Sequence, residues 1–232
     1  MKKLEGKWAL VTGSARGIGQ QIAMGLAREG CNVIVHGRKK ENCIKTLELL
    51  KEYGIKTDVV EGKLSKVDDI EKMIGEVKKN HNCIDILYNN AAIQNKWKEI
   101  YDITLDEWKE TFMINFYSIV MTCNAFAPGM KERGFGRIIN LTSGIKDIPQ
   151  LAPYSVSKAA VDKYSMDLAA DLRGTGVLVN FLDPGWLKTD LGGENAMHEV
   201  TTVLPGALVP ALLDNDGDTG KFFCAQDFRE DK

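Results

Sequence analysis

The hydrophobic pattern of this chain alternates between short apolar runs and segments in which apolar residues recur at helical spacing. Short runs bounded by turn residues predict buried strands, whereas apolar residues at i, i+3, i+4 and i+7 predict helices packed on a core. The predicted strands cover residues 8–11, 33–35, 57–61, 84–88, 137–141 and 177–182. The predicted helices cover residues 17–27, 42–53, 68–79, 104–120, 121–133 and a segment that begins near Pro153 and reaches Ala169.

Two of these helices carry expectations for individual residues. In the helix over 42–53, the spacing of Ile44, Leu47 and Leu50 predicts that all three face the core. In the helix over 121–133, Pro128 predicts an interruption, because proline lacks a backbone donor and its ring clashes with the preceding turn.

The order of strands and helices predicts a single α/β domain. Residues 8–35 are predicted to form strand, helix and strand, a βαβ unit whose crossover we expect to be right-handed. A chain of 232 residues is long enough for one well-buried core and short for two. We therefore expect one Rossmann fold over residues 1–232, with a doubly wound parallel β-sheet and helices on both of its faces.

Charge and composition disfavour nucleic-acid binding, membrane insertion and secretion. The formal net charge is −2, so no broad basic field favours nucleic acid or an anionic membrane surface. The basic start is followed by charged and glycine positions at 5–7, not by the apolar segment of a signal peptide, and no apolar run approaches the ~20 residues of a membrane span. The five cysteines are scattered without a CxxC pair, which favours a reducing compartment. We predict a cytoplasmic protein and no metal site.

The chemically most informative pair is Tyr154 and Lys158, which lie four residues apart on a predicted helix and therefore on one face of it. A free tyrosine, with a pKa of about 10, is a poor base near neutrality. A lysine ammonium roughly 4–5 Å away would lower that pKa by about 2–3 units and allow proton exchange with an alcohol or carbonyl oxygen. Taken alone, this spacing is more commonly an exposed helix face.

Further motifs accompany this pair in a characteristic order. They are the glycine-rich segment 12–19 (TGSARGIG), Asn89-Asn90-Ala91-Ala92, Asn115, Ser143 and Pro184-Gly185. With these motifs in this order and spacing, the chain resembles the short-chain dehydrogenase/reductase family over residues 4–223. The short segment after residue 190 and the TGKFF ending resemble the carbonyl-reductase-like branch, and residues 220–223 fit the usual last strand of the family. The resemblance implies an oxidoreductase that moves a hydride between a nicotinamide cofactor and a ketone, aldehyde or alcohol.

The glycine-rich segment predicts a nucleotide site, because a turn of this kind between a strand and a helix lets the backbone approach a pyrophosphate. Together with the resemblance, it predicts the cofactor-binding residues Gly13, Ser14, Arg16, Gly17, Ile18, Gly19, Arg38, Leu64, Asn90, Tyr154, Lys158, Pro184, Gly185, Leu187 and Thr189. In the family, the backbone after the Pro-Gly pair holds the nicotinamide carboxamide. A threonine placed like Thr189 reaches the amide or the phosphates.

The predicted cofactor is NADP(H), with NAD(H) left open. No acidic residue follows the second strand before Glu41, whereas an acid there would repel a 2′-phosphate. The resemblance implies that Arg16 and Arg38 bind that phosphate, at roughly 1.5–3 kcal/mol for each charge-assisted hydrogen bond. Lys63 stands where the family usually has an aspartate that accepts a bond from adenine, and a lysine cannot accept one. This departure concerns the adenine contact, to which Leu64 can still offer its backbone.

By resemblance, four residues carry catalysis. Ser143 holds the substrate oxygen, Tyr154 is the general acid and base, and Lys158 lowers the pKa of Tyr154 and binds the nicotinamide ribose. Asn115 holds a relay water through its backbone carbonyl. Thr142 stays an alternative to Ser143, because the loop before Tyr154 is slightly short for the family.

The substrate is predicted to be a hydrophobic carbonyl such as a steroid or an aromatic ketone. The expected substrate-binding residues are Ser143, Tyr154 and Trp186. A short lid is expected near residues 190–204, which contain the pair Gly192-Gly193. The apolar pocket is predicted from Trp97, Leu151, Trp186 and Leu191, with ordinary packing of these side chains as the alternative.

Several other functions stay open at this point. The family also includes 3-oxoacyl thioester reductases and sugar dehydrogenases, and related lyases and epimerases are longer chains with an added substrate domain. A non-enzymatic NADP-binding regulator would be expected to have lost part of the catalytic set, whose four positions are all filled here. Family members form dimers through the helix at 121–133 and the helix that carries Tyr154, so we expect a homodimer or homotetramer.

Overall fold

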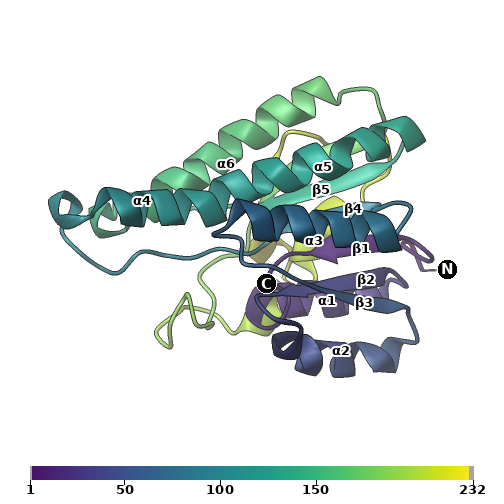
Figure 1. Cartoon of the computed structure of the whole chain (residues 1–232), viewed down its shortest axis with the longest axis horizontal. Helices are drawn as coiled ribbons and strands as arrows, with labels where there is room; N and C mark the ends of the chain where they lie inside the picture. The colour runs from purple at the N-terminus through teal and green to yellow at the C-terminus, as the bar shows by residue number, and fades with distance from the viewer. Residues whose placement is uncertain (1, 230–232) are drawn as a thin grey trace.

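Within residues 2–229, which the computed structural model describes, seven parallel strands form one central sheet (Figure 1). The strands are β1 (Trp8–Val11), β2 (Asn32–Gly37), β3 (Thr57–Glu61), β4 (Ile86–Asn89), β5 (Gly136–Leu141), β6 (Val177–Asp183) and β7 (Phe222–Cys224). Their order across the sheet is β3-β2-β1-β4-β5-β6-β7, so the direction in which strands are added reverses between β1 and β4. The predicted doubly wound parallel sheet is confirmed. Met1 and residues 230–232 of the predicted domain lie outside the described residues.

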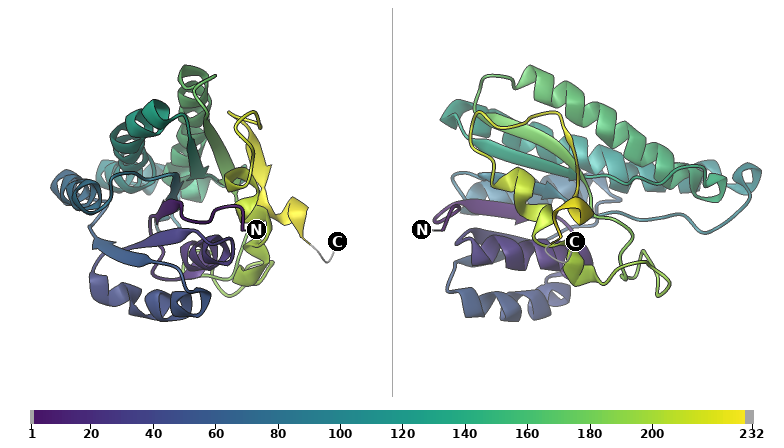
Figure 2. Two further views of the ribbon diagram at one scale, coloured as in Figure 1. Left: turned by 90° about the vertical axis from the view of Figure 1, so that its right-hand side faces the viewer. Right: turned by 180° about the vertical axis from the view of Figure 1, so that it is seen from behind.

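Helices cover both faces of this sheet (Figure 2). They are α1 (Gly17–Arg28), α2 (Ile44–Leu50), α3 (Val67–Asn80), α4 (Leu105–Phe112), α5 (Ser118–Arg133) and α6 (Ala152–Asp171). Apolar side chains of α1, α2 and the 3₁₀ segment η7 (Gly206–Ala211) pack on one face, and those of α3, α5 and α6 pack on the other. No helix within the described residues is both long and apolar enough to cross a membrane.

The central strands are buried on both sides, which explains their continuous apolar runs. In β1, Ala9 and Val11 belong to one apolar cluster and Leu10 to the other. Consecutive side chains of a strand point to opposite faces, so a parallel strand between two helix layers needs apolar residues at every position.

The two residue-level expectations for the helices were partly wrong. Residues 40–53 form a 3₁₀ turn, the helix α2 and a second 3₁₀ turn, so Cys43 and Leu50 are buried while Ile44 is 53% exposed. The first 3₁₀ turn places Cys43, instead of Ile44, on the side that faces the core. Pro128 does not interrupt α5, because it lies on the exposed side, where water can satisfy the carbonyl that loses its donor.

The expected lid segment leaves the carboxyl end of the sheet after β6 and projects from it, as Figure 2 shows (right panel, lime). It consists of turns and the 3₁₀ segment η6 (Val200–Val203). An isolated parallel bridge between Leu187 and His198 brings these two residues side by side, so residues 188–197 form a closed loop.

Candidate active site

The predicted site residues gather at the carboxyl ends of four neighbouring strands. The glycine-rich segment follows β1, the Asn-Asn pair ends β4, Ser143 follows β5, and Pro184-Gly185 follows β6. Because β1 and β4 flank the point where strand order reverses, these groups surround the crevice in which open α/β sheets bind ligands.

The glycine-rich segment has the geometry of a pyrophosphate cradle. Gly13 and Gly17 have φ values of +66° and +61°, a region that favours glycine. A side chain at Gly19 would place its Cβ 2.5 Å from both Asn90 Nδ2 and the Gly13 carbonyl oxygen. α1 begins at Gly17 and no side chain caps it, so the backbone N–H groups of its first turn can face an anion. The residues present therefore fit the pyrophosphate of a dinucleotide.

Two side chains from other strands hold this cradle. Asn90 donates from Nδ2 to the carbonyl oxygens of Thr12 (2.8 Å) and Gly13 (3.2 Å). His36, at the end of β2, accepts from the Gly13 N–H at Nδ1 (3.0 Å) and donates from Nε2 to the Gly62 carbonyl (3.1 Å). Burial lowers the pKa of His36 to about 4, so this histidine is neutral at pH 7 and can play both parts.

His36 is a residue that sequence reasoning missed. It connects the cradle to the loop after β3, which contains Leu64, the expected adenine contact. The available signal was a polar residue at the end of an otherwise apolar strand. Its partners, however, are backbone groups of two distant loops, which only the folded chain brings together.

The basic residues predicted to bind a 2′-phosphate lie on the surface beside the cradle. Arg16 forms an ion pair with Asp190 of the lid segment (2.7 Å), with both side chains largely exposed. Arg38 directly follows β2 and is exposed. Lys63 donates its backbone N–H to Asp69 (3.3 Å), and Leu64 is buried.

Ser143, Tyr154 and Lys158 meet at the ends of β5 and α6. The Ser143 hydroxyl hydrogen-bonds the phenol of Tyr154, whose side chain is almost fully buried. Lys158 is also buried, and its Nζ donates to the carbonyl oxygen of Leu141 (2.7 Å) at 5.7 Å from the centre of the Tyr154 ring. The hydroxyl of Thr142 instead lies against α6, 3.3 Å from the Lys158 carbonyl oxygen, so Ser143 is the hydroxyl that faces the phenol.

The expected lowering of the Tyr154 pKa is wrong for this structure. Burial raises the pKa of the phenol, the Ser143 hydrogen bond opposes that rise, and the Asp183 carboxylate adds to it. The Lys158 ammonium points at a backbone carbonyl and does not offset the burial. Burial also lowers the pKa of Lys158 to about 8, against the attraction of Asp162 and Asp183.

Asn115 lies in the π-helical segment η4 (Met113–Tyr117), which joins α4 and α5. Its buried amide accepts from the Ile93 N–H (2.9 Å) and donates to the Ile93 carbonyl (2.9 Å) and to Ser157 Oγ (3.1 Å). The side chain thus ties the helix to the chain after β4 and to α6. A π-helical turn of this kind is frequent at functional sites.

The turn after β6 is braced from two sides. Gly185 has φ +83°, and its N–H donates to Asp183 Oδ1 (2.9 Å). Gln226, from the end of the chain, donates from Nε2 to the Pro184 carbonyl (2.8 Å). Thr189 approaches the cradle, with its Cγ2 3.6 Å from the position of a Cβ on Gly17. Sequence reasoning missed Gln226, because no motif marks it.

The residues expected to line an apolar pocket are mostly on the surface. Trp97 is 66% exposed, Trp186 55% and Leu191 38%, whereas Leu151 is buried. Trp186 donates from its indole nitrogen to the Gly192 carbonyl (2.8 Å), which fixes it along the lid segment. The structure therefore shows exposed side chains at three of these positions instead of an enclosed pocket built from all four residues.

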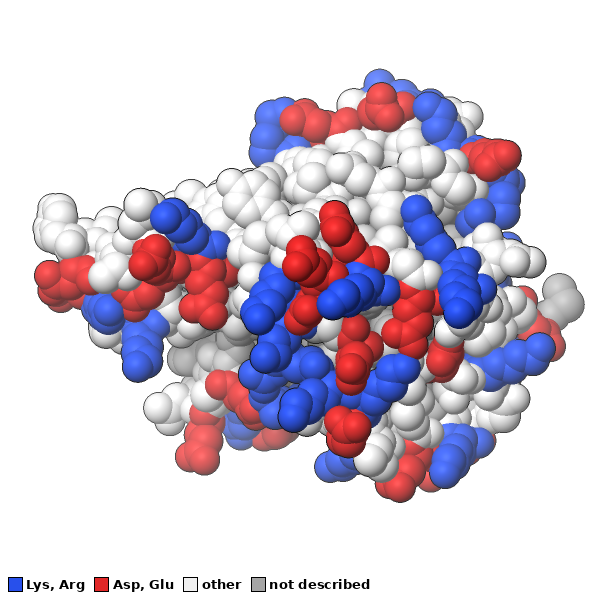
Figure 3. Space-filling view, viewed as in Figure 1, with Lys and Arg blue, Asp and Glu red and all other residues white. Residues whose placement is uncertain are grey.

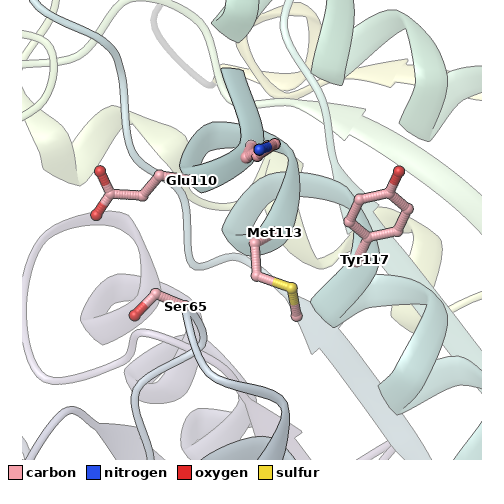
Figure 4. Close-up of a pocket in the computed structure, with 5 residues that line it drawn as sticks. Ser65, Glu110, Met113 and Tyr117 are labelled. Atoms are coloured by element: carbon pink, nitrogen blue, oxygen red, sulfur yellow. The ribbon is translucent and has the colours of Figure 1, made fainter. Parts of the chain in front are cut away.

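A separate hollow of about 460 Å³ lies between α4, η4 and the chain after β3 (Figure 4). It is lined by Ser65, Lys109, Glu110, Met113 and Tyr117. None of the predicted site residues lines it.

Fold and site together place the chain among the nucleotide-dependent oxidoreductases of the α/β class. A family model described as short chain dehydrogenase matches residues 7–199. The uncharacterized oxidoreductase YvrD of Bacillus subtilis (strain 168) is 38% identical over 216 residues, which cover 92% of this chain and 78% of that protein. Dehydrogenase/reductase SDR family member 4 of Mus musculus is 36% identical over 188 residues, which cover 80% of this chain and 67% of that protein. The chain belongs to the short-chain dehydrogenase/reductase family.

A solved structure agrees with this assignment. The gluconate 5-dehydrogenase from Burkholderia cenocepacia J2315, in complex with NADP and tartrate, is 28% identical to this chain. It matches with a TM-score of 0.83 over 95% of this chain and 94% of that one.

Proposed function

We propose that the protein is an NADP(H)-dependent oxidoreductase that interconverts a ketone or aldehyde with an alcohol. The observation that carries this proposal is the arrangement of Ser143 with the buried Tyr154 and Lys158 beside a glycine cradle that fits a pyrophosphate. When bound, the nicotinamide supplies or accepts the hydride. The chain's own residues orient the carbonyl and handle its proton.

Each catalytic side chain has a part that its surroundings support. Ser143 donates to the substrate oxygen, and Tyr154 gives that oxygen a proton in reduction and removes it in oxidation. Because the pKa of Tyr154 is raised, the phenol holds its proton at pH 7, which suits carbonyl reduction. Lys158 binds the nicotinamide ribose, and the backbone carbonyl of Asn115 holds the relay water.

The preference for NADP(H) rests on charge around the adenosine end of the site. Arg38 follows β2 with no carboxylate beside it in sequence, and Arg16 stands at the start of α1. The Burkholderia relative has NADP bound. The residues Leu64, Asn90, Leu187 and Thr189 complete the proposed cofactor contacts.

Replacing Arg38 with alanine is expected to weaken NADPH binding by about ten- to a hundredfold and to leave NADH binding unchanged, because one charge-assisted bond is worth roughly 1.5–3 kcal/mol. The measurement is titration of the protein with each cofactor, followed by cofactor fluorescence. Arg28→Ala removes the same charge at the other end of α1 and serves as the control. Equal losses for both cofactors would contradict the preference.

For the substrate, we propose a hydrophobic carbonyl such as a steroid or an aromatic ketone, on the strength of the exposed Trp186 and Leu191 at the lid segment and of the exposed Trp97 in the loop after β4. A second candidate is a sugar acid or related hydroxy acid, as for the Burkholderia gluconate 5-dehydrogenase. The two candidate substrates differ in the group that would contact the lid residues. The first would present an apolar ring, and the second would present hydroxyl groups.

Oxidation of NADPH and NADH by the purified protein against pools of steroids, aromatic ketones, diketones, aldehydes and keto-sugar acids tests the function. Turnover with NADPH and the apolar pools is expected. Turnover with the sugar acids alone would select the second candidate. Tight NADPH binding without turnover in any pool would favour the regulator over the enzyme.

We further propose that the protein is a cytoplasmic homo-oligomer. Figure 3 shows charges of both signs interspersed over α3 and α4, and a largely uncharged area between α5 and α6, with charged side chains along the outer edge of α6. Tyr117 of η4, which precedes α5, is 50% exposed, and Val156 and Met166 of α6 are each 45% exposed. All five cysteines are free, as expected in a reducing compartment.

A further inference from the structure

Asp183 connects two loops that border the proposed active site. It is the last residue of β6. Its Oδ2 accepts from the N–H of Gly144 and its Oδ1 accepts from the N–H of Gly185, both at 2.9 Å. Gly144 directly follows Ser143, and Gly185 belongs to the turn that is expected to hold the nicotinamide. One carboxylate therefore fixes the spacing between Ser143, whose hydroxyl is proposed to bind the substrate oxygen, and the Pro184-Gly185 turn.

The backbone around Asp183 is shaped for this contact. A Cβ on Gly144 would lie 2.7 Å from Asp183 Oδ2, so a glycine is needed for the loop to come this close. Gly185 adopts φ +83°, which presents its N–H to the carboxylate two residues before it. Both of the acceptor oxygens are thus engaged by backbone donors that are part of neighbouring loops.

The charge of Asp183 acts on the catalytic groups from the β6 side. It raises the pKa of Tyr154 and also raises that of Lys158. From α6, Lys158 and the half-buried Asp162 face the same space. After β5, the neutral Ser143 hydroxyl bonds the phenol, and the neutral Thr142 hydroxyl bonds Asp162. One buried oxygen of Asp162, Oδ1, has no hydrogen-bond partner within the described residues.

We propose that Asp183 is a positioning residue that locks the Ser143 loop to the Pro184-Gly185 turn and places its negative charge on the β6 side of the Tyr154 phenol. This inference rests on the proposed carbonyl–alcohol chemistry. It assigns Asp183 no contact with the substrate, and its effect passes through the two loops and through the phenol.

Asp183→Asn is the principal variant, because the amide keeps one acceptor oxygen but turns an NH₂ toward the other backbone donor. We expect kcat to fall about ten- to a hundredfold, the scale of a small misplacement of reacting groups. Without the negative charge the phenolate is favoured, so the rising limb of alcohol oxidation should move to lower pH. Asp183→Glu restores the charge but not the short reach, so it should recover the pH limb and not the full kcat.

A direct titration separates this inference from the proposed function. Tyrosine labelled with ¹³C at Cζ is followed by NMR, with Tyr154→Phe identifying the resonance, and the Tyr154 midpoint should fall in Asp183→Asn. Asp171→Asn, at the far end of α6, removes the same charge and should leave both kcat and the midpoint unchanged.

Each outcome decides either the inference or the proposed function. An unchanged Tyr154 midpoint in Asp183→Asn overturns the inference, whether or not kcat falls, because the residue would then be at most a structural brace. An unchanged kcat in an active protein overturns it as well. If the wild-type protein turns over none of the substrate pools, the proposed function fails, while the tyrosine titration still decides the electrostatic part of the inference.

Discussion

Replacing Tyr154 with phenylalanine is expected to lower kcat by about 10²–10⁴-fold, the usual contribution of a positioned general acid. The variant loses the phenol proton and the hydrogen bond with Ser143. It keeps the ring, which is only 8% exposed and packs in the same slot. The fold and the cofactor cradle should therefore persist, and the NADPH dissociation constant should stay within about threefold of its wild-type value.

Stopped-flow and steady-state measurement of NADPH oxidation, beside fluorescence titration of NADPH binding, checks this expectation. Tyr164→Phe is the matched control, because Tyr164 lies on the same helix, three turns farther from the site, and contacts Cys123. It should retain kcat within about twofold. Residual activity of Tyr154→Phe close to wild type would remove the phenol from the proposed chemistry.

The fold could be predicted from the sequence because local signals agreed with one another. Each central strand is a short apolar run followed by a turn, and parallel strands buried on both faces have that pattern. The predictions that differ from the structure concern single residues and element boundaries. β7 is a three-residue edge strand that begins two residues later than expected, and Ile44 faces solvent because a 3₁₀ turn precedes α2.

The site could be predicted only as far as motifs reach. The spacing of Tyr154 and Lys158 places both on α6, but their pKa values depend on burial and on charges from other strands. Asp183 lies 29 positions after Tyr154, and His36 joins two loops on either side of β2. No spacing along the chain reveals these contacts, so the direction of the Tyr154 pKa shift came out opposite to the prediction.

Replacing Lys158 with methionine is expected to make the fold more stable and the enzyme inactive. Lys158 is 3% exposed, and burial lowers its pKa from 10.5 to about 8 even with Asp162 and Asp183 nearby. At about 1.4 kcal/mol per pH unit, holding this charge costs the folded state about 3 kcal/mol at pH 7. Loss of the charge-assisted bond to the Leu141 carbonyl returns about 1.5–3 kcal/mol of that. The net gain should be at most about 1.5 kcal/mol, while kcat falls by at least about a hundredfold.

The pH range in which Lys158→Met is more stable than wild type follows from the pKa of Lys158 in the folded and in the unfolded chain. The folded pKa lies below the unfolded one, so between about pH 8 and 10.5 the unfolded chain binds more protons and wild-type stability rises with pH. The stability advantage of the methionine variant should therefore be full below about pH 8 and shrink toward pH 10.5. Urea unfolding of both proteins across this pH range measures the stability difference.

Lys163→Met is the control. The exposed ammonium of Lys163 pairs with Asp167 on the same helix, so this variant should change stability by less than about 1 kcal/mol at every pH. A Lys158→Met variant less stable than wild type at pH 7 would show that the buried ammonium is stabilised by its surroundings, and that the low pKa argued for it is wrong.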